Sequence, residues 1–233
     1  MKSLVVALCA LFFSACAAHR GADAFPQIVA AVRPTVVLLT MRVPNQDRDS
    51  TEKFQDAYAS GVVISSGSWG SDVLTVEHAI ERARNLRATI GANKREPASV
   101  AGQDGKLDIA VVRLKRGNLP TAKLGKSADL LPGEAIGIIG YPIPDAFEEE
   151  GLGTTSSIYA GRISSLRKHA IELNLPIVPG ESGGPVFRAD NGDVVGIAES
   201  RFDEERSIGF ALPIDDAKPF LRRFARGLEL AAH

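Results

Sequence analysis

The most constraining feature of this sequence is a series of short β-rich runs, with turn residues and little helical pattern between them. Twelve such runs cover residues 35–41, 58–65, 73–76, 86–91, 98–101, 109–114, 135–139, 157–164, 170–175, 185–188, 194–198 and 208–211. Glycine, proline, asparagine or aspartate lies between most of them, as strands joined by tight turns require. The pattern predicts an all-β sandwich or barrel and argues against a parallel α/β sheet.

Two segments at the ends have helical patterns. Residues 25–34 are expected to form a short helix that Pro34 stops. Residues 215–233 are expected to form a C-terminal helix with Asp215 as its cap, because Phe220, Leu221, Phe224 and Leu228 recur at about 3.6-residue spacing. The stretch 44–57 is polar and carries both signs of charge, which favours a loop.

Composition narrows the class of protein further. The chain has 233 residues, of which 45% are hydrophobic and 24% charged, as in ordinary globular proteins. Lys and Arg total 27 against 28 Asp and Glu, so no basic excess points to nucleic acid. Both cysteines, Cys9 and Cys16, lie in the first 16 residues. The remainder of the chain therefore has neither a disulfide framework nor a multi-cysteine metal site.

The N-terminus has the parts of an export signal in the expected order. Lys2 is positive, residues 4–13 are apolar, and small residues run from Ser14 to Ala18. A run of about ten apolar residues is too short to cross a bilayer, which takes about 20. We therefore expect residues 1–16 to be a signal peptide and the mature protein to be exported. The alternative is a buried N-terminal helix.

The way this signal is processed has two possible forms. Residues 13–16, Phe-Ser-Ala-Cys, resemble the bacterial lipobox, in which the cysteine receives a diacylglycerol; Phe13 stands where leucine is usual. The resemblance implies a lipoprotein anchored through Cys16, and Ala17 after it points to the outer membrane. The alternative is cleavage near residues 15–18, which would leave the protein free in the periplasm or secreted.

The segment with the most chemical content is GESGGPVF, residues 180–187. Glycines on both sides of Ser182 permit a tight turn that exposes its hydroxyl. Such a turn aims the backbone N–H groups of Gly180 and Ser182 into one pocket, where an oxyanion could be held. Side chains at Gly183 and Gly184 are expected to crowd an approaching substrate. A glycine-rich hairpin with an incidental serine is the alternative.

A serine nucleophile needs a base and a group that orients the base. His78 follows a short apolar run and leads into an expected helical turn, residues 79–84, whereas His19, His169 and His233 are poor rivals. Asp108 directly precedes the apolar run 109–114 and could hold the imidazole Nδ1–H. Asp104 belongs to a turn, Asp72 is a weaker candidate, and a strand-capping role for Asp108 remains open.

Taken together, these segments resemble the trypsin-like serine proteases, and more closely their bacterial HtrA/Deg branch. The motifs SGVVISSG, LTxxH, DIAVVRL, GESGGPVF, VVGIA and IGFALPI occur in family order between about residues 59 and 213. The resemblance implies two six-stranded antiparallel β-barrels, at about 35–116 and 132–213, within a protease domain of residues 25–214. It also implies a triad of His78, Asp108 and Ser182 in the cleft between them.

The sequence departs from the family in three ways. Glu181 precedes the nucleophile where HtrA proteins usually have asparagine, and Glu77 precedes His78. These two carboxylates could raise the pKa of His78 or repel acidic substrates. The PDZ domains usual in HtrA proteins are not expected here, because only about 20 residues follow Pro213. The family pattern puts the primary specificity pocket near Pro176, Ile177 and Ala198, which implies apolar substrate residues, with Glu199 pointing away.

The resulting expectation is a serine endopeptidase that needs no metal or cofactor. Its partners would be protein or peptide substrates, cut in exposed or unfolded segments. Two other functions stay open: a non-catalytic binding or scaffold protein on the same fold, and a serine esterase. The sequence predicts neither the natural substrate nor the oligomeric state.

Overall fold

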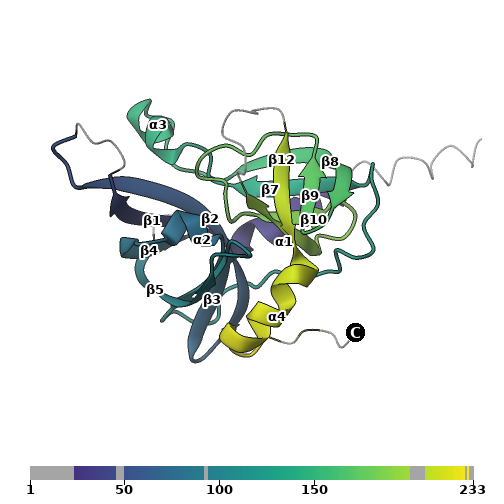
Figure 1. Cartoon of the computed structure of the whole chain (residues 1–233), viewed down its shortest axis with the longest axis horizontal. Helices are drawn as coiled ribbons and strands as arrows, with labels where there is room; N and C mark the ends of the chain where they lie inside the picture. Colours follow the sequence, from purple (N-terminus) through teal and green to yellow (C-terminus); the bar gives the residue numbers. More distant parts are fainter. Residues whose placement is uncertain (1–23, 46–49, 92–93, 200–207, 229, 231–233) are drawn as a thin grey trace, which may run out of the picture.

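Two β-barrels make up the fold. The computed structural model describes residues 24–45, 50–91, 94–199, 208–228 and 230, and this part of the chain contains twelve strands in two closed barrels (Figure 1). The first barrel consists of β1 (Val36–Pro44), β2 (Phe54–Gly67), β3 (Gly70–Thr75), β4 (Arg84–Ile90), β5 (Lys94–Asp104) and β6 (Ile109–Leu114). The second consists of β7 (Ala135–Gly140), β8 (Ser157–Arg167), β9 (Ala170–Leu173), β10 (Pro185–Arg188), β11 (Val194–Glu199) and β12 (Gly209–Pro213).

The two barrels have the same topology. Neighbouring strands follow the order β1-β2-β3-β6-β5-β4 in the first barrel, and the second repeats this order with β7-β8-β9-β12-β11-β10. The barrel strand pairs are antiparallel, as between Val36 and Val62 or Ile139 and Ile158. The predicted fold class, two six-stranded antiparallel barrels with a short C-terminal helix, is therefore confirmed.

The apolar runs are continuous because many strands are buried on both faces. In β1, Val37, Leu39 and Met41 point into the first barrel, while Val36 and Leu38 pack toward the second. Strand side chains alternate between faces, so a strand with two buried faces reads as an unbroken apolar run. This is why the sequence shows little alternation there.

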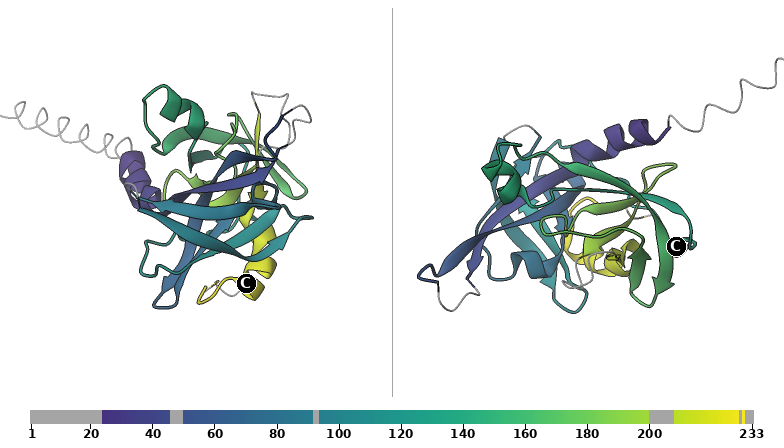
Figure 2. Two further views of the ribbon diagram at one scale, coloured as in Figure 1. Left: turned by 90° about the vertical axis from the view of Figure 1, so that its left-hand side faces the viewer. Right: turned by 90° about the horizontal axis from the view of Figure 1, so that it is seen from above.

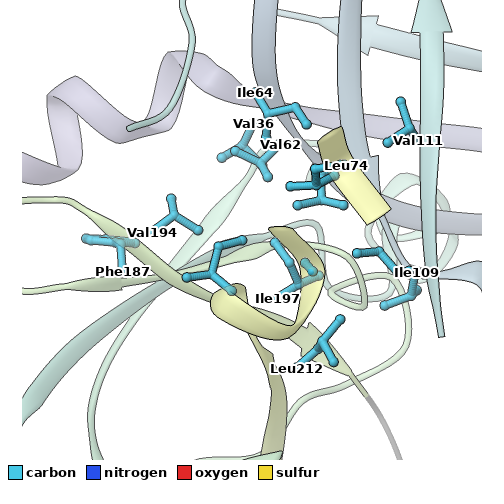
Figure 3. Close-up of a cluster of buried hydrophobic side chains, with 14 of the residues drawn as sticks. Val36, Val62, Ile64, Leu74, Ile109, Val111, Phe187, Val194, Ile197 and Leu212 are labelled. Carbon is cyan, nitrogen blue, oxygen red and sulfur yellow. The ribbon is translucent and has the colours of Figure 1, made fainter. Parts of the chain in front are cut away.

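A shared core joins the barrels, and Figure 3 shows side chains from both meeting in it. The first barrel contributes Val36, Val62, Ile64, Leu74, Ile109 and Val111, and the second contributes Phe187, Val194, Ile197 and Leu212. Each of these side chains is at most 3% exposed. Burial on this scale stabilises by about 1.5–3 kcal/mol per large apolar side chain, so the barrels are held as one unit.

Short helices lie at the ends and between strands. They are α1 (Ala24–Val32), the 3-10 turn η1 (Arg33–Thr35), α2 (Glu77–Ile80), α3 (Pro144–Glu149) and α4 (Ile214–Phe224). Figure 2 shows α1 leading into β1. None of the helices in the described ranges is long and apolar enough to span a bilayer. The expected signal peptide and Cys16 lie outside the described residues.

Several sequence-based boundaries are corrected by the structure. The polar stretch 44–57 is not all loop, because β2 begins at Phe54, and the helical turn after His78 ends at Ile80. Helix α4 ends at Phe224, so Leu228 lies beyond it. Asp215 does not cap α4: it lies inside the first turn, and its carboxylate accepts the backbone N–H groups of Ser127 and Ala128.

Candidate active site

The three candidate catalytic residues come from both barrels. His78 lies in α2 after β3, and Asp108 directly precedes β6, so both belong to the first barrel. Ser182 lies in the turn before β10 of the second barrel. A groove of about 600 Å³ is lined by His78 on one side and by Pro179, Gly180 and Ser182 on the other. The fold therefore brings His78 and Ser182 to the same groove.

Asp108 holds His78 at two points. Its Oδ2 lies 2.6 Å from Nδ1 of the imidazole, and its Oδ1 accepts the backbone N–H of His78 at 2.8 Å. The pair fixes both the position and the rotation of the ring. With Nδ1 engaged by the carboxylate, Nε2 is the nitrogen left to exchange a proton with another group.

The charges around this pair favour a protonated imidazole. The hydrogen bond with Asp108 raises the pKa of His78, the charges of Asp108, Glu199 and Glu77 add to the rise, and burial opposes it. Burial alone would raise the pKa of Asp108, but the hydrogen bonds and charge of His78 outweigh it, and that pKa is lowered. The pair is thus suited to stabilise an imidazolium next to a carboxylate.

Glycines are required in the turn that carries Ser182. Gly180 and Gly183 have φ of 93° and 90°, in the region that favours glycine. A Cβ at Gly183 would lie 2.1 Å from the carbonyl oxygen of Ser60, and one at Gly184 would lie 2.4 Å from that of Ile139. The expectation that side chains here would crowd a substrate is therefore corrected: they would collide with the protein's own backbone.

The peptide groups of this turn are held in defined orientations. The carbonyl of Pro179 accepts the N–H of Ile143 at 2.8 Å, and that of Glu181 accepts the N–H of Gly184 at 2.9 Å. In a trans peptide the N–H points opposite to the carbonyl. The N–H groups of Gly180 and Ser182 therefore point away from these partners, and within the described residues neither donates to the protein.

Ser60 is a site residue that the sequence analysis missed. It is fully buried in β2, and its hydroxyl donates to the carbonyl of Gly180 at 2.7 Å while accepting the N–H of Tyr141 at 2.9 Å. Its own N–H donates to the carbonyl of Ser182 at 2.9 Å. Ser60 thus ties the first barrel to the turn around Ser182. Its polar side chain within an apolar strand was the available signal, because a buried hydroxyl needs partners.

Three glutamates lie around the site. Glu77 and Glu199 both act on His78 through their charge, so the expectation for Glu77 agrees with its position. Glu199 is 1% exposed, and strand alternation in β11 puts it on the same face as Ile197, toward the first barrel. Glu181, whose side chain is buried, is not among the main groups that raise the pKa of His78.

Several other predicted residues lie elsewhere. Pro176, Ile177 and Ala198 do not line the groove at Ser182; Ile177 and Ala198 pack in the core of the second barrel, and Pro176 is exposed. Their assignment to a specificity pocket stays a prediction. The rival carboxylate Asp72 is bound elsewhere, with Oδ1 2.7 Å from Nε of Arg113.

Comparisons with known proteins match this architecture. A family model described as a trypsin-like peptidase domain matches residues 59–197, more than half of the chain. The serine protease Do-like HtrA of Bacillus subtilis is 30% identical over 183 residues, which are 73% of this chain and 40% of that protein. A protein of Halomonas elongata named as a probable periplasmic serine endoprotease DegP-like is 32% identical over 169 residues, 68% of this chain and 33% of that protein.

Solved structures give the same result. The HtrA-type protease AlgW with a tripeptide superposes with a TM-score of 0.69 at 25% identity, covering 85% of this chain and 62% of that chain. The serine endoprotease from Yersinia pestis gives 0.66 at 25% identity, covering 87% of this chain and 67% of that one. This chain spans well under half the length of the two curated relatives named above. The chain is similar to HtrA-type serine proteases, and it belongs to the trypsin-like peptidase family.

Proposed function

We propose that this chain is a serine endopeptidase in which Ser182 is the nucleophile, His78 the base and then the acid, and Asp108 the residue that orients His78. The observation that carries the proposal is the two-point contact between Asp108 and His78, with Ser182 opening into the same groove as His78. No metal or cofactor takes part in the proposed reaction.

The first half-reaction forms an acyl-enzyme. Oγ of Ser182 bonds to the carbonyl carbon of the scissile bond, and Nε2 of His78 takes the hydroxyl proton. The substrate oxygen becomes an oxyanion, which the N–H groups of Gly180 and Ser182 stabilise. The C–N bond then breaks, and His78 gives its proton to the leaving amine.

The second half-reaction releases the acid. A water molecule gives a proton to His78 and attacks the acyl carbon, and the second oxyanion is held by the same two N–H groups. The bond between the acyl carbon and Oγ of Ser182 then breaks, and His78 returns the proton to Oγ of Ser182. Asp108 stays ionised throughout and stabilises the imidazolium that forms twice in the cycle.

The proposed substrates are exposed or unfolded segments of proteins. An open groove between two barrels can accept an extended chain, and the related HtrA-type protease AlgW has been solved with a tripeptide. The pocket prediction of Pro176, Ile177 and Ala198 adds a preference for apolar residues before the cut bond. This preference remains a proposal about specificity.

The proposed place of action is the cell envelope. The support is the signal-like N-terminus and a relative named as periplasmic. Attachment to the outer membrane through a lipidated Cys16, or release into the periplasm or medium without it, are the two forms of this proposal. Mass spectrometry of the mature N-terminus separates them, because an acylated Cys16 and an unmodified peptide starting at Ala18 or His19 differ in mass.

Labelling with a fluorophosphonate tests the function. We expect one equivalent to react with the chain and to be found on Ser182, and Ser182→Ala to take up none. An absence of labelling in the wild type would favour a non-catalytic scaffold. Hydrolysis rates of an amide and an ester with the same acyl group distinguish a peptidase from an esterase. An esterase would cleave the ester and leave the amide intact.

A further inference from the structure

A buried carboxyl group lies directly beneath the turn that carries Ser182. Glu181 is 1% exposed, and its Oε1 is buried without a hydrogen-bond partner among the described residues. Burying such a group is costly, and the proposed reaction does not use it. A carboxyl group buried at this cost is expected to hold a neighbouring part of the chain in place.

Glu181 binds both backbone polar groups of a single residue three positions earlier. Its Oε2 accepts the N–H of Val178 at 2.9 Å, and its backbone N–H donates to the carbonyl of Val178 at 3.1 Å. Only Pro179 and Gly180 lie between the two residues. This double contact closes residues 178–181 into a ring that leaves the Pro179–Gly180 peptide little room to rotate.

A second residue, Tyr159 on β8, lies close to the carboxyl group. Its hydroxyl lowers the pKa of Glu181, against the effect of burial. Without these contacts, the peptides on either side of Gly180 would be held only through the N–H of Ile143 and the hydroxyl of Ser60. A residue without Cβ crosses the positive-φ region at little cost. Rotation of the Pro179–Gly180 peptide would turn the Gly180 N–H out of the groove.

We propose that Glu181 and Tyr159 form a clamp that keeps the N–H of Gly180 directed at the substrate oxyanion. Both are positioning residues, and the inference rests on the proposed function and deepens it. The clamp differs from the contact of Ser60, which comes from the other barrel and holds the following peptide through the carbonyl of Gly180.

The clamp works through hydrogen bonding. Burial raises the pKa of Glu181 and outweighs the lowering by the N–H of Val178 and the nearby hydroxyl of Tyr159. An amide at this position keeps an acceptor oxygen for Val178 and a polar group for Tyr159. Glutamine should therefore replace Glu181, whereas alanine should not.

Kinetics on full-length Glu181→Ala, Glu181→Gln and Tyr159→Phe proteins test the clamp. We expect Glu181→Ala to lower kcat about tenfold with KM nearly unchanged, less than the ~10²-fold or more for a lost oxyanion donor. Affinity for a peptide aldehyde, which forms the oxyanion, should fall by the same factor. Tyr159→Phe should show a smaller loss of the same kind, and Glu181→Gln should stay close to the wild type.

The matched control is Glu172→Ala, which removes a glutamate of the same barrel that pairs with Arg167 at the surface. It should change neither kcat nor aldehyde affinity. Unchanged kcat in Glu181→Ala, or an equal loss in Glu181→Gln and Glu181→Ala, would overturn the clamp. If Glu181→Ala does not fold, Tyr159→Phe and Glu181→Gln still decide the matter.

Hydrogen–deuterium exchange gives a readout that does not depend on hydrolysis. The amides of residues 178–182 should exchange faster in Glu181→Ala and Tyr159→Phe than in the wild type, and at the wild-type rate in Glu172→Ala. Faster exchange in these two variants, together with a wild type that neither takes up the label nor hydrolyses peptides, would mean that the proposed function fails while the clamp stands. Unchanged exchange in both variants would mean that the clamp is wrong, whatever the activity.

Discussion

At the scale of single residues, the site depends on backbone conformations that few residues accept. Asp108 has φ of 53°, in the left-handed region that aspartate tolerates better than most residues. In this conformation one carboxylate oxygen of Asp108 contacts the imidazole ring of His78, and the other accepts its backbone N–H. A residue that orients a base must hold it against rotation, and two contacts do so where one would not.

Replacing Asp108 tests this role. We expect Asp108→Asn to lose about 10⁴-fold in kcat while the protein stays folded, because the amide would favour the wrong imidazole tautomer. Steady-state kinetics together with circular dichroism check both halves of the expectation. Retention of half of the wild-type kcat would show that another residue orients His78.

The pH dependence of kcat/KM follows from the charges around His78. The base must be neutral, so activity should fall as the pH drops through the raised pKa of His78, above its ordinary value of about 6.5. Glu77→Gln removes a negative charge that favours the imidazolium, so the acid limb should move to lower pH. Glu172→Gln is the control and should leave it in place; a shift to higher pH in Glu77→Gln would contradict the account.

Substitutions at two glycines allow the cost of backbone strain to be measured apart from that of a steric clash. Gly183 and Gly133 have nearly the same φ, 90° and 89°, but only Gly183 has atoms where a Cβ would go. Gly133→Ala should cost about 1–2 kcal/mol of unfolding free energy and keep full activity. Gly183→Ala should cost more and also abolish hydrolysis. Denaturant unfolding and casein assays of both variants check this, and equal behaviour would refute it.

At the scale of elements, the C-terminal end of α4 and the residues just after it are fastened to the first barrel. Asp72 in β3 is fully buried, and it binds Arg113 in β6 through contacts of 2.7 and 3.0 Å and also accepts the N–H of Arg226. Arg113 donates in turn to the carbonyl of Phe224 at the end of α4. The contacts link β3, β6 and the C-terminal segment through one carboxylate.

Breaking this link should affect stability and leave catalysis intact. Asp72→Ala leaves the charge of Arg113 without its carboxylate partner, and removing one member of a buried pair costs about 3 kcal/mol. The value of kcat, measured per labelled active site, should stay near that of the wild type. Lys123→Ala, which breaks an exposed pair with Asp193, is the control and should cost about 1 kcal/mol or less. A drop in kcat with unchanged stability would reverse the assignment of Asp72 and Asp108.

At the scale of the whole molecule, the division into two barrels could be predicted because local patterns encode it. Short apolar runs between turn residues marked all twelve strands, and motif order indicated the fold. The start of β2 could not be predicted, since Gln55 and Asp56 are polar and exposed, and Phe54 and Ala57 lie outside the shared core. Helix α3 has only two apolar residues besides its proline, too few to give a period.

The candidate catalytic residues could also be predicted from local sequence, whereas the contacts that hold them in place could not. His78, Asp108 and Ser182 stand in short motifs, so sequence alone identifies them as candidates. The contacts of Ser60 with Gly180 span 120 residues, and those of Asp72 with Arg113 span 41. Such pairings follow from the closure of the barrels and from the packing of one against the other, and no local pattern records them.

Hydrolysis of unfolded casein by the wild type, Ser182→Ala, His78→Ala and the double variant is the most direct measurement of the central claim. Each single variant should lose about 10⁴-fold or more in kcat, and the double variant should lose no more than either, because the two residues act as one unit. Casein hydrolysis by Ser182→Ala at half the wild-type rate, or independent and additive losses, would contradict the assignment of Ser182 and His78 as nucleophile and base.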